Sequence, residues 1–203
     1  MQATYGVILF SLLLFGCRQT EPIGRSELQA YVANKTNNLK KEQTVDGVRV
    51  EVMYRPSSLL VAQELEPLQV QDTSLIKNLE DKYSNHYYFI IKFSKENKEA
   101  IRQLGSFGNY SSMLQVLAFN MQNHISLRVE EDIIPVADYY FDQTYGMSNG
   151  NTILVSFNKM AFNNKNKFEI YISECGLGTG DIKFSFDRRD LEDTPRLDYR
   201  SIN

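Results

Sequence analysis

Short segments in which apolar and polar residues alternate recur along most of this 203-residue chain. Residues 48–54, 168–172 and 182–186 alternate in this way, as expected for strands with one buried face. The continuous apolar runs 87–93 and 153–157 are typical of central strands. The pattern predicts a mainly β fold, an antiparallel β-sandwich of the immunoglobulin-like or a related type, with roughly seven or eight strands and short flanking helices. An α+β fold is the alternative.

The short flanking helices are expected at three places. The first begins at Ser26, whose hydroxyl is predicted to cap it. The second covers residues 59–65 behind a cap from Ser57 or Ser58. A further helical turn or two is expected over residues 96–104.

Residues 117–129 hold the most informative local pattern. Apolar residues occupy the odd positions on both sides of residues 122–124, so a three-residue loop there places all of them on one face of a hairpin. The alternative is a buried helix over residues 112–121. Residues 139–141 are expected to add a short strand or an edge.

The N-terminal residues indicate export from the cell. Residues 7–15 form an apolar run that only Ser11 interrupts, and no charged residue precedes Arg18. A transmembrane helix needs about 20 apolar residues, whereas the core of a signal peptide needs about 7–15. The run therefore predicts a secretory signal peptide. In the alternative interpretation, the run is a buried strand or helix and Cys17 is a core thiol.

The sequence Leu-Phe-Gly-Cys at residues 14–17 resembles the lipobox of bacterial lipoprotein signal peptides. With its asparagine-rich loops and strand sequences such as residues 47–55 and 153–157, the chain is similar to cell-envelope lipoproteins of Bacteroidetes-type bacteria. This resemblance implies Sec-dependent export, cleavage before Cys17, and attachment of lipid chains such as palmitate to that cysteine. The mature protein is then expected to be anchored to a membrane of the cell envelope, the outer rather than the inner membrane.

These predictions divide the chain into four parts. A signal peptide covers residues 1–16, and residues 17–44 form a lipidated N-terminus with a tether and a short helix. The β-sandwich domain covers residues 45–186. The charge-dense residues 187–203 are expected to form an exposed C-terminal tail.

The composition offers few groups for catalysis or metal binding. Two histidines and two cysteines cannot supply several metal sites or a disulfide framework, so no metal and no cofactor is expected. A net charge of −3 gives no electrostatic footprint for nucleic acid. His86 and His124 lie in no recognisable catalytic motif, so no catalytic residue is assigned. Cys175 is expected to be a small buried residue, and the glycine-rich residues 176–180 a flexible hairpin connection.

An aromatic cluster in residues 139–145 is the one feature typical of binding. Tyr139, Tyr140 and Tyr145 are candidate partner-binding residues, because tyrosines supply flat, amphipathic contact surface. In the alternative, Tyr139 and Phe141 point into the core and Tyr140 pairs across an edge strand.

Three functions are compatible with these patterns. The first is a membrane-anchored, non-enzymatic module that binds or scaffolds a partner in the envelope. The second is a glycan-binding accessory lipoprotein. The third is a hydrolase, whose paired carboxylates the sequence does not locate because folded distance defines the pair.

Overall fold

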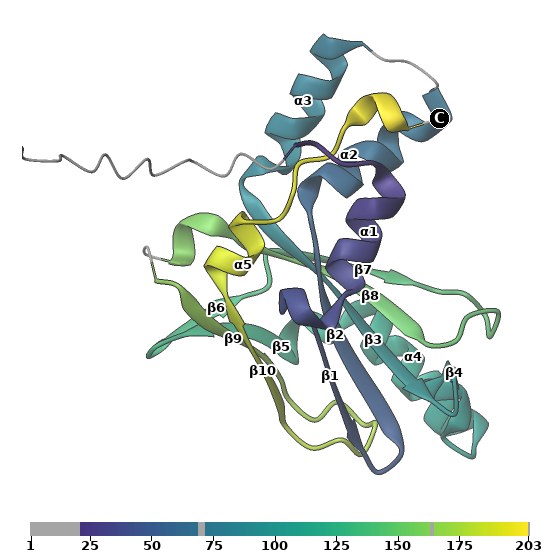
Figure 1. The fold of residues 1–203 in the computed structure, drawn as a ribbon. Helices are drawn as coiled ribbons and strands as arrows, with labels where there is room; N and C mark the ends of the chain where they lie inside the picture. The colour runs from purple at the N-terminus through teal and green to yellow at the C-terminus, as the bar shows by residue number, and fades with distance from the viewer. Residues whose placement is uncertain (1–20, 69–71, 163–164, 203) are drawn as a thin grey trace, which may run out of the picture.

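The protein folds into two antiparallel β-sheets that pack face to face, with three of its helices gathered at one end (Figure 1). The computed structural model describes residues 21–68, 72–162 and 165–202. The predicted signal peptide and the predicted lipidation site Cys17 lie outside the described residues. The two sheets confirm the predicted mainly antiparallel β, sandwich-type architecture with short helices.

The first sheet has six strands in the order β1–β2–β3–β8–β7, with the short strand β4 paired to β3. Residues 96–104, where helical turns were expected, form β4 and the 3-10 helix η3. β1 was placed in the tether, but it pairs along its whole length with β2 and belongs to the sheet. The strands are β1 (Lys40–Val45), β2 (Val48–Arg55), β3 (His86–Lys95), β4 (Lys98–Glu99), β7 (Asp138–Asp142) and β8 (Asn151–Asn158).

The second sheet has four strands in the order β10–β9–β5–β6. The predicted strands at residues 168–172 and 182–186 are its neighbours β9 and β10. The strands of this sheet are β5 (Ile125–Val129), β6 (Asp132–Pro135), β9 (Lys167–Ile172) and β10 (Ile182–Asp187).

Aromatic side chains join the two sheets. The ring of Phe89 on β3 lies 6.0 Å from that of Phe168 on β9 and 5.4 Å from that of Phe186 on β10, measured between centroids. Phe168 and Phe186 stack on each other at 5.7 Å. All three side chains are buried, so they fix the spacing of the sheets across the core.

Five α-helices and six 3-10 helices complete the described part of the chain. None of these helices is long and apolar enough to cross a membrane. They are α1 (Arg25–Ala33), η1 (Lys35–Asn37), α2 (Ser57–Leu65), η2 (Glu66–Leu68), α3 (Thr73–Ser84), η3 (Ala100–Gln103), α4 (Phe107–Phe119), η4 (Met121–Asn123), η5 (Lys159–Phe162), α5 (Arg188–Glu192) and η6 (Tyr199–Ser201).

The two predicted helices near Ser26 and at residues 59–65 are present as α1 and α2, but the serines do not cap them. Gly24 is the N-cap of α1, and its backbone N–H donates to the Glu27 carboxylate at 3.0 Å. Pro56 is the N-cap of α2, which makes Ser57 the first helical residue.

The predicted hairpin around residues 122–124 is wrong, and the alternative helix is correct. Residues 107–119 form α4, whose first turn is capped by the Ser106 hydroxyl, an acceptor for the Asn109 N–H at 3.1 Å. Met113 and Leu117 are both buried, whereas Phe119 is 77% exposed. Burial therefore follows a spacing of four, which is helical, although the apolar residues also satisfy a spacing of two.

The charge-dense C-terminal residues are packed against the domain, contrary to the predicted exposed tail. Leu191 is 2% exposed and Leu197 is 6% exposed. The backbone of Ile23 bonds to this segment through the carbonyl of Arg196 and the N–H of Asp198, each at 2.9 Å. Much of the charge is neutralised locally, as in an Arg200–Asp198 ion pair of 2.9 Å, so it does not keep the apolar residues in water.

We expect Leu191→Ala to lower the free energy of unfolding by about 2–4 kcal/mol, because it leaves a cavity under α5. Urea denaturation followed by circular dichroism measures this change. Leu68→Ala is the matched control, since Leu68 is exposed and its loss should change the free energy by less than about 0.5 kcal/mol. Equal stability of both variants would show that the C-terminal segment is not part of the core.

Candidate functional site

The outer face of the first sheet carries apolar residues that the core does not use. Ile90 on β3 lies opposite Leu154 on β8, which in turn lies opposite Tyr140 on β7. These three residues, the apolar row, run across three neighbouring strands. Ile90 and Leu154 are partly exposed, Tyr140 is 65% exposed, and none of them packs against either hydrophobic cluster of the described residues. An exposed apolar row on a sheet face is typical of an interaction surface.

A polar row lies beside the apolar row, on the side of the helices. Tyr88 on β3 is opposite Ser156 on β8, and Ser156 is opposite Asp138 on β7. All three residues line a cleft of about 730 Å³ between this face and the helices α2 and α3. From the helices, the cleft is lined by Leu60, Gln63 and Glu64 of α2 and by Lys82 and Tyr83 of α3.

Aromatic rings form one wall of this cleft. The rings of Tyr83 and Tyr88 meet edge to face with centroids 5.8 Å apart, and the imidazole of His86 lies 6.2 Å from the ring of Tyr88. Burial raises the pKa of the Tyr88 hydroxyl, and the nearby Tyr83 adds to this effect, so Tyr88 is neutral at physiological pH. The cleft therefore presents uncharged phenol rings.

A hydrogen-bonded triad fixes the helical wall. The Glu64 carboxylate of α2 accepts from the Lys82 ammonium of α3 at 2.7 Å and from the Tyr83 hydroxyl. These hydrogen bonds lower the pKa of Glu64. Glu64 is thus a charged group whose charge is balanced by Lys82, and it ties α2 to α3 beside the cleft.

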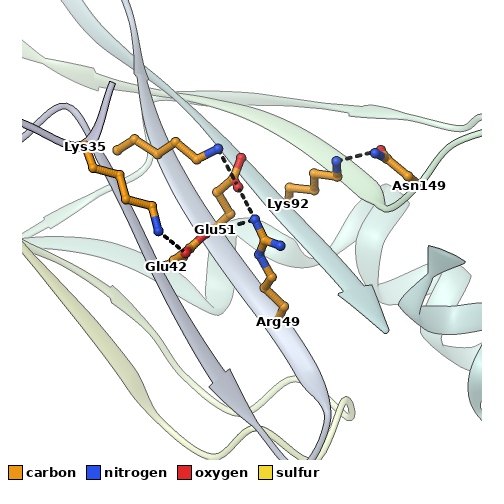
Figure 2. A network of polar contacts seen from close by, with 7 residues as sticks. Lys35, Glu42, Arg49, Glu51, Lys92 and Asn149 are labelled. Carbon is orange, nitrogen blue, oxygen red and sulfur yellow. Dashed lines mark hydrogen bonds and ion pairs between the residues drawn. The ribbon is translucent and has the colours of Figure 1, made fainter. Parts of the chain in front are cut away.

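Several other charged residues of the outer face neutralise one another. Glu42 accepts from Lys35 at 2.6 Å and pairs with Arg49 at 2.9 Å, and Arg49 also pairs with Glu51 at 3.3 Å. Figure 2 shows this network along β1 and β2, separate from the Lys92 ammonium that donates to the Asn149 side chain at 2.6 Å. The ion pairs leave the cleft and the apolar row as the parts of this face that differ from an ordinary solvated surface.

The structure does not bring the three predicted tyrosines together. Tyr140 lies in the apolar row. Tyr139 points to the opposite side of β7 and packs against the core, where burial raises its pKa. Tyr145 lies in the loop before β8, with a positive φ of 52° and 64% of its surface exposed. That loop is held by the buried Glu99 carboxylate, which accepts from the Thr144 hydroxyl at 2.5 Å and from the Gly146 N–H at 2.7 Å.

The predicted flexible connection at residues 176–180 is an organised loop. The Glu174 carboxylate accepts from the backbone N–H groups of Gly176, Gly178 and Gly180 at 2.6, 3.0 and 2.5 Å. All three glycines have positive φ, which lets their N–H groups converge. Burial alone would raise the pKa of Glu174, but these hydrogen bonds outweigh it and lower the pKa. The N–H groups of this loop could bind an anion, but the Glu174 carboxylate already occupies that position.

In the described part of the chain, Cys175 and His124 form no second site. Cys175 is buried, and burial raises the pKa of its thiol to about 12, so it is inert as expected. His124 contacts the Ser173 hydroxyl at 3.2 Å at the start of β5. Within residues 21–68, 72–162 and 165–202, no group of three or more His, Cys, Asp or Glu side chains could hold a metal ion.

Sequence analysis missed most of the cleft. Tyr83 and Lys82 lie on α3, a helix that the alternation of residues did not suggest, and Asp138 was only the residue before an expected strand. One signal was available, because Tyr88 occupies the outward position of the apolar run 87–93, between inward residues.

A comparison of the chain with protein families, curated proteins and solved structures found no significant match to any of them.

We expect an NMR titration of side-chain carboxyl groups to place the pKa of Glu64 below the ordinary value of 4.5, because its ionised form accepts two hydrogen bonds. Lys82→Met and Tyr83→Phe should each raise this pKa toward 4.5. Since the folded pKa is the lower one, this interaction stabilises the fold above the unfolded pKa and is lost as the pH falls through the folded pKa. A pKa that neither substitution moves would contradict the triad.

Proposed function

We propose that this protein is a membrane-anchored lipoprotein of the cell envelope, held by lipid chains on Cys17, that binds a partner on its outer face without catalysing a reaction. The apolar row of Ile90, Leu154 and Tyr140 is the observation that carries the proposal. Leaving such side chains in water costs the isolated domain free energy that burial against a partner would recover, about 25 cal/mol per Å² of apolar surface.

The start of the described chain is compatible with such an anchor. Ile23 is fixed to the C-terminal segment by two backbone hydrogen bonds. Cys17 precedes Ile23 by six residues, and six residues reach about 20 Å at most. A lipid on Cys17 would therefore keep the end of the domain that carries Ile23 and Leu197 close to the membrane surface, which suits a module that works at that surface.

The chemistry of the cleft supports binding more than hydrolysis. A general acid in a glycoside hydrolase needs a raised pKa, so that its carboxyl group is protonated near neutral pH. The pKa of Glu64 is lowered instead. The other carboxylate that lines the cleft, Asp138, already accepts the backbone N–H of Tyr139 at 2.8 Å.

Replacing the proposed anchor tests the first half of this proposal. In a bacterial host with the lipoprotein pathway, Cys17→Ser should abolish metabolic labelling with palmitate and move the protein to the soluble fraction, because the acylated thiol is lost. Cys175→Ser is the control, since a buried thiol should not be labelled. Unchanged labelling and fractionation of Cys17→Ser would rule out the lipoprotein assignment.

Two exposed tyrosines test the second half. Tyr140→Arg should abolish retention of envelope components by the immobilised full-length protein in mild detergent, because it puts a charge into the apolar row. Tyr145→Arg is the matched control: Tyr145 has nearly the same exposure, 64% against 65%, but lies in the loop outside the row. Equal retention by the two variants would exclude the outer face as the binding surface.

A further inference from the structure

We propose that the ligand of the cleft is a neutral oligosaccharide, which stacks on Tyr88 and hydrogen-bonds to Gln63 and Asp138. This inference rests on the proposed binding function and names the class of ligand for the same face.

The shape of the cleft suits a small extended ligand better than the flat surface of a folded protein. Its volume of about 730 Å³ lies within the range of pockets for small molecules, about 300–1,000 Å³. Its floor consists of paired strands, and its wall is fixed by the bonds from Lys82 and Tyr83 to Glu64. Little conformational freedom is lost when a ligand enters a site that is already formed.

The lining combines an aromatic platform with hydrogen-bonding groups of both kinds. A sugar ring has apolar C–H faces and a rim of hydroxyl groups that both donate and accept. Tyr88 offers an aromatic ring, Asp138 accepts, and the Gln63 amide nitrogen donates while its oxygen accepts from the Arg55 guanidinium at 3.4 Å. The Ser156 hydroxyl donates to the Asp138 backbone carbonyl at 3.2 Å and the Tyr139 N–H donates to Asp138 Oδ1 at 2.8 Å, so Asp138 Oδ2 is left for a ligand.

The charges of the cleft disfavour ionic ligands. Glu64 and Lys82 neutralise each other, and the Asp138 carboxylate at one end of the polar row is balanced by the Arg55 guanidinium, which lies opposite Tyr88 on β2 at the other end. Any charged ligand would therefore meet a group of like charge, and the Tyr83 ring is already taken by the Lys82 ammonium, 4.8 Å from its centre. A neutral polyhydroxy ligand avoids both conflicts.

The apolar row extends the cleft along the sheet. Leu154 belongs to both the cleft and the row, and Tyr140 is the next residue across the strands. Adjacent strands lie about 4.8 Å apart, which is close to the length of one sugar unit. A chain of several sugars can therefore leave the cleft over Leu154 and place a further ring on Tyr140.

Calorimetric titration of the full-length protein in detergent tests this assignment. The neutral probes are maltohexaose, cellohexaose, xylohexaose, mannohexaose and chitohexaose, and the charged probes are hexagalacturonate and trilysine. At least one neutral probe should bind, and both charged probes should bind at least about tenfold more weakly. Tyr88→Ala and Asp138→Asn should each weaken the neutral probe by about tenfold, since they remove the platform and the charged acceptor.

The variants carry matched controls. Asp142→Asn changes the other outward acid of β7, which does not line the cleft, and should bind like the unaltered protein. Circular dichroism shows whether Tyr88→Ala still folds. If it does not, Asp138→Asn still tests the ligand contact, because the asparagine keeps an oxygen that accepts the Tyr139 N–H.

Three results would overturn the inference: no binding of any neutral probe, binding that ignores Asp138→Asn, or tighter binding of either charged probe. If no neutral probe binds but the immobilised protein still captures envelope protein, and this capture depends on Tyr140, the oligosaccharide is rejected and the proposed function stands. Loss of that capture would reject the proposed function itself.

Discussion

The contact between Phe89 and the stacked rings of Phe168 and Phe186 is the interaction on which the rest of the architecture depends. It joins the central strand of the first sheet to two strands of the second, across the middle of the core. Because side chains alternate along a strand, this contact also decides which face of β3 is buried. With Phe89 turned inward, its neighbours Tyr88 and Ile90 must face outward. The candidate binding face is thus a direct consequence of the core.

Strand register then assembles the site from segments far apart in the chain. Pairing of β3 with β8 sets Ile90 beside Leu154 and Tyr88 beside Ser156, and pairing of β8 with β7 adds Tyr140 and Asp138. A slip of one residue would exchange the inward and outward sets and bury the polar row. The same hydrogen bonds that build the sheet therefore fix the order of apolar and polar rows on its outer surface.

Most strands and the α2 helix could be predicted from the sequence, whereas α3, the other helix of the cleft, was not predicted. A period of two in residues such as 168–172 has one simple solution, a half-buried strand, and the structure confirms it. Residues 117–121 satisfy both periods, and only the packing of Met113 and Leu117 against the core decides for a helix. The α3 helix does carry a helical pattern, because Asp72 caps it and Leu75, Ile76, Leu79 and Tyr83 fall on one face. Its position depends on tertiary contacts with α2, which local sequence does not encode.

The C-terminal segment was missed for a related reason. Its five acidic residues and four arginines suggested a solvated tail, but composition does not show how charges are arranged in space. Asp187 and Asp198 each bond the arginine two residues later and cap the turn that follows. Once the charges are satisfied locally, Leu191 and Leu197 are free to pack. Leu191 and Leu197, together with the partly buried Tyr199 and Ile202, cover that end of the domain.

The cleft wall rests partly on a second hydrophobic cluster, smaller than the main core. α2 is shared between two hydrophobic clusters, because Leu59 and Ala62 join the main core while Val61 and Leu65 pack with Leu79 of α3. A helix held by so small a cluster opens at a lower free energy than the strands it faces. The bonds from Lys82 and Tyr83 to Glu64 supplement that cluster at the rim of the cleft. A ligand that contacts both the strands and this wall therefore stabilises the α2–α3 pair, in proportion to its contacts with the two helices.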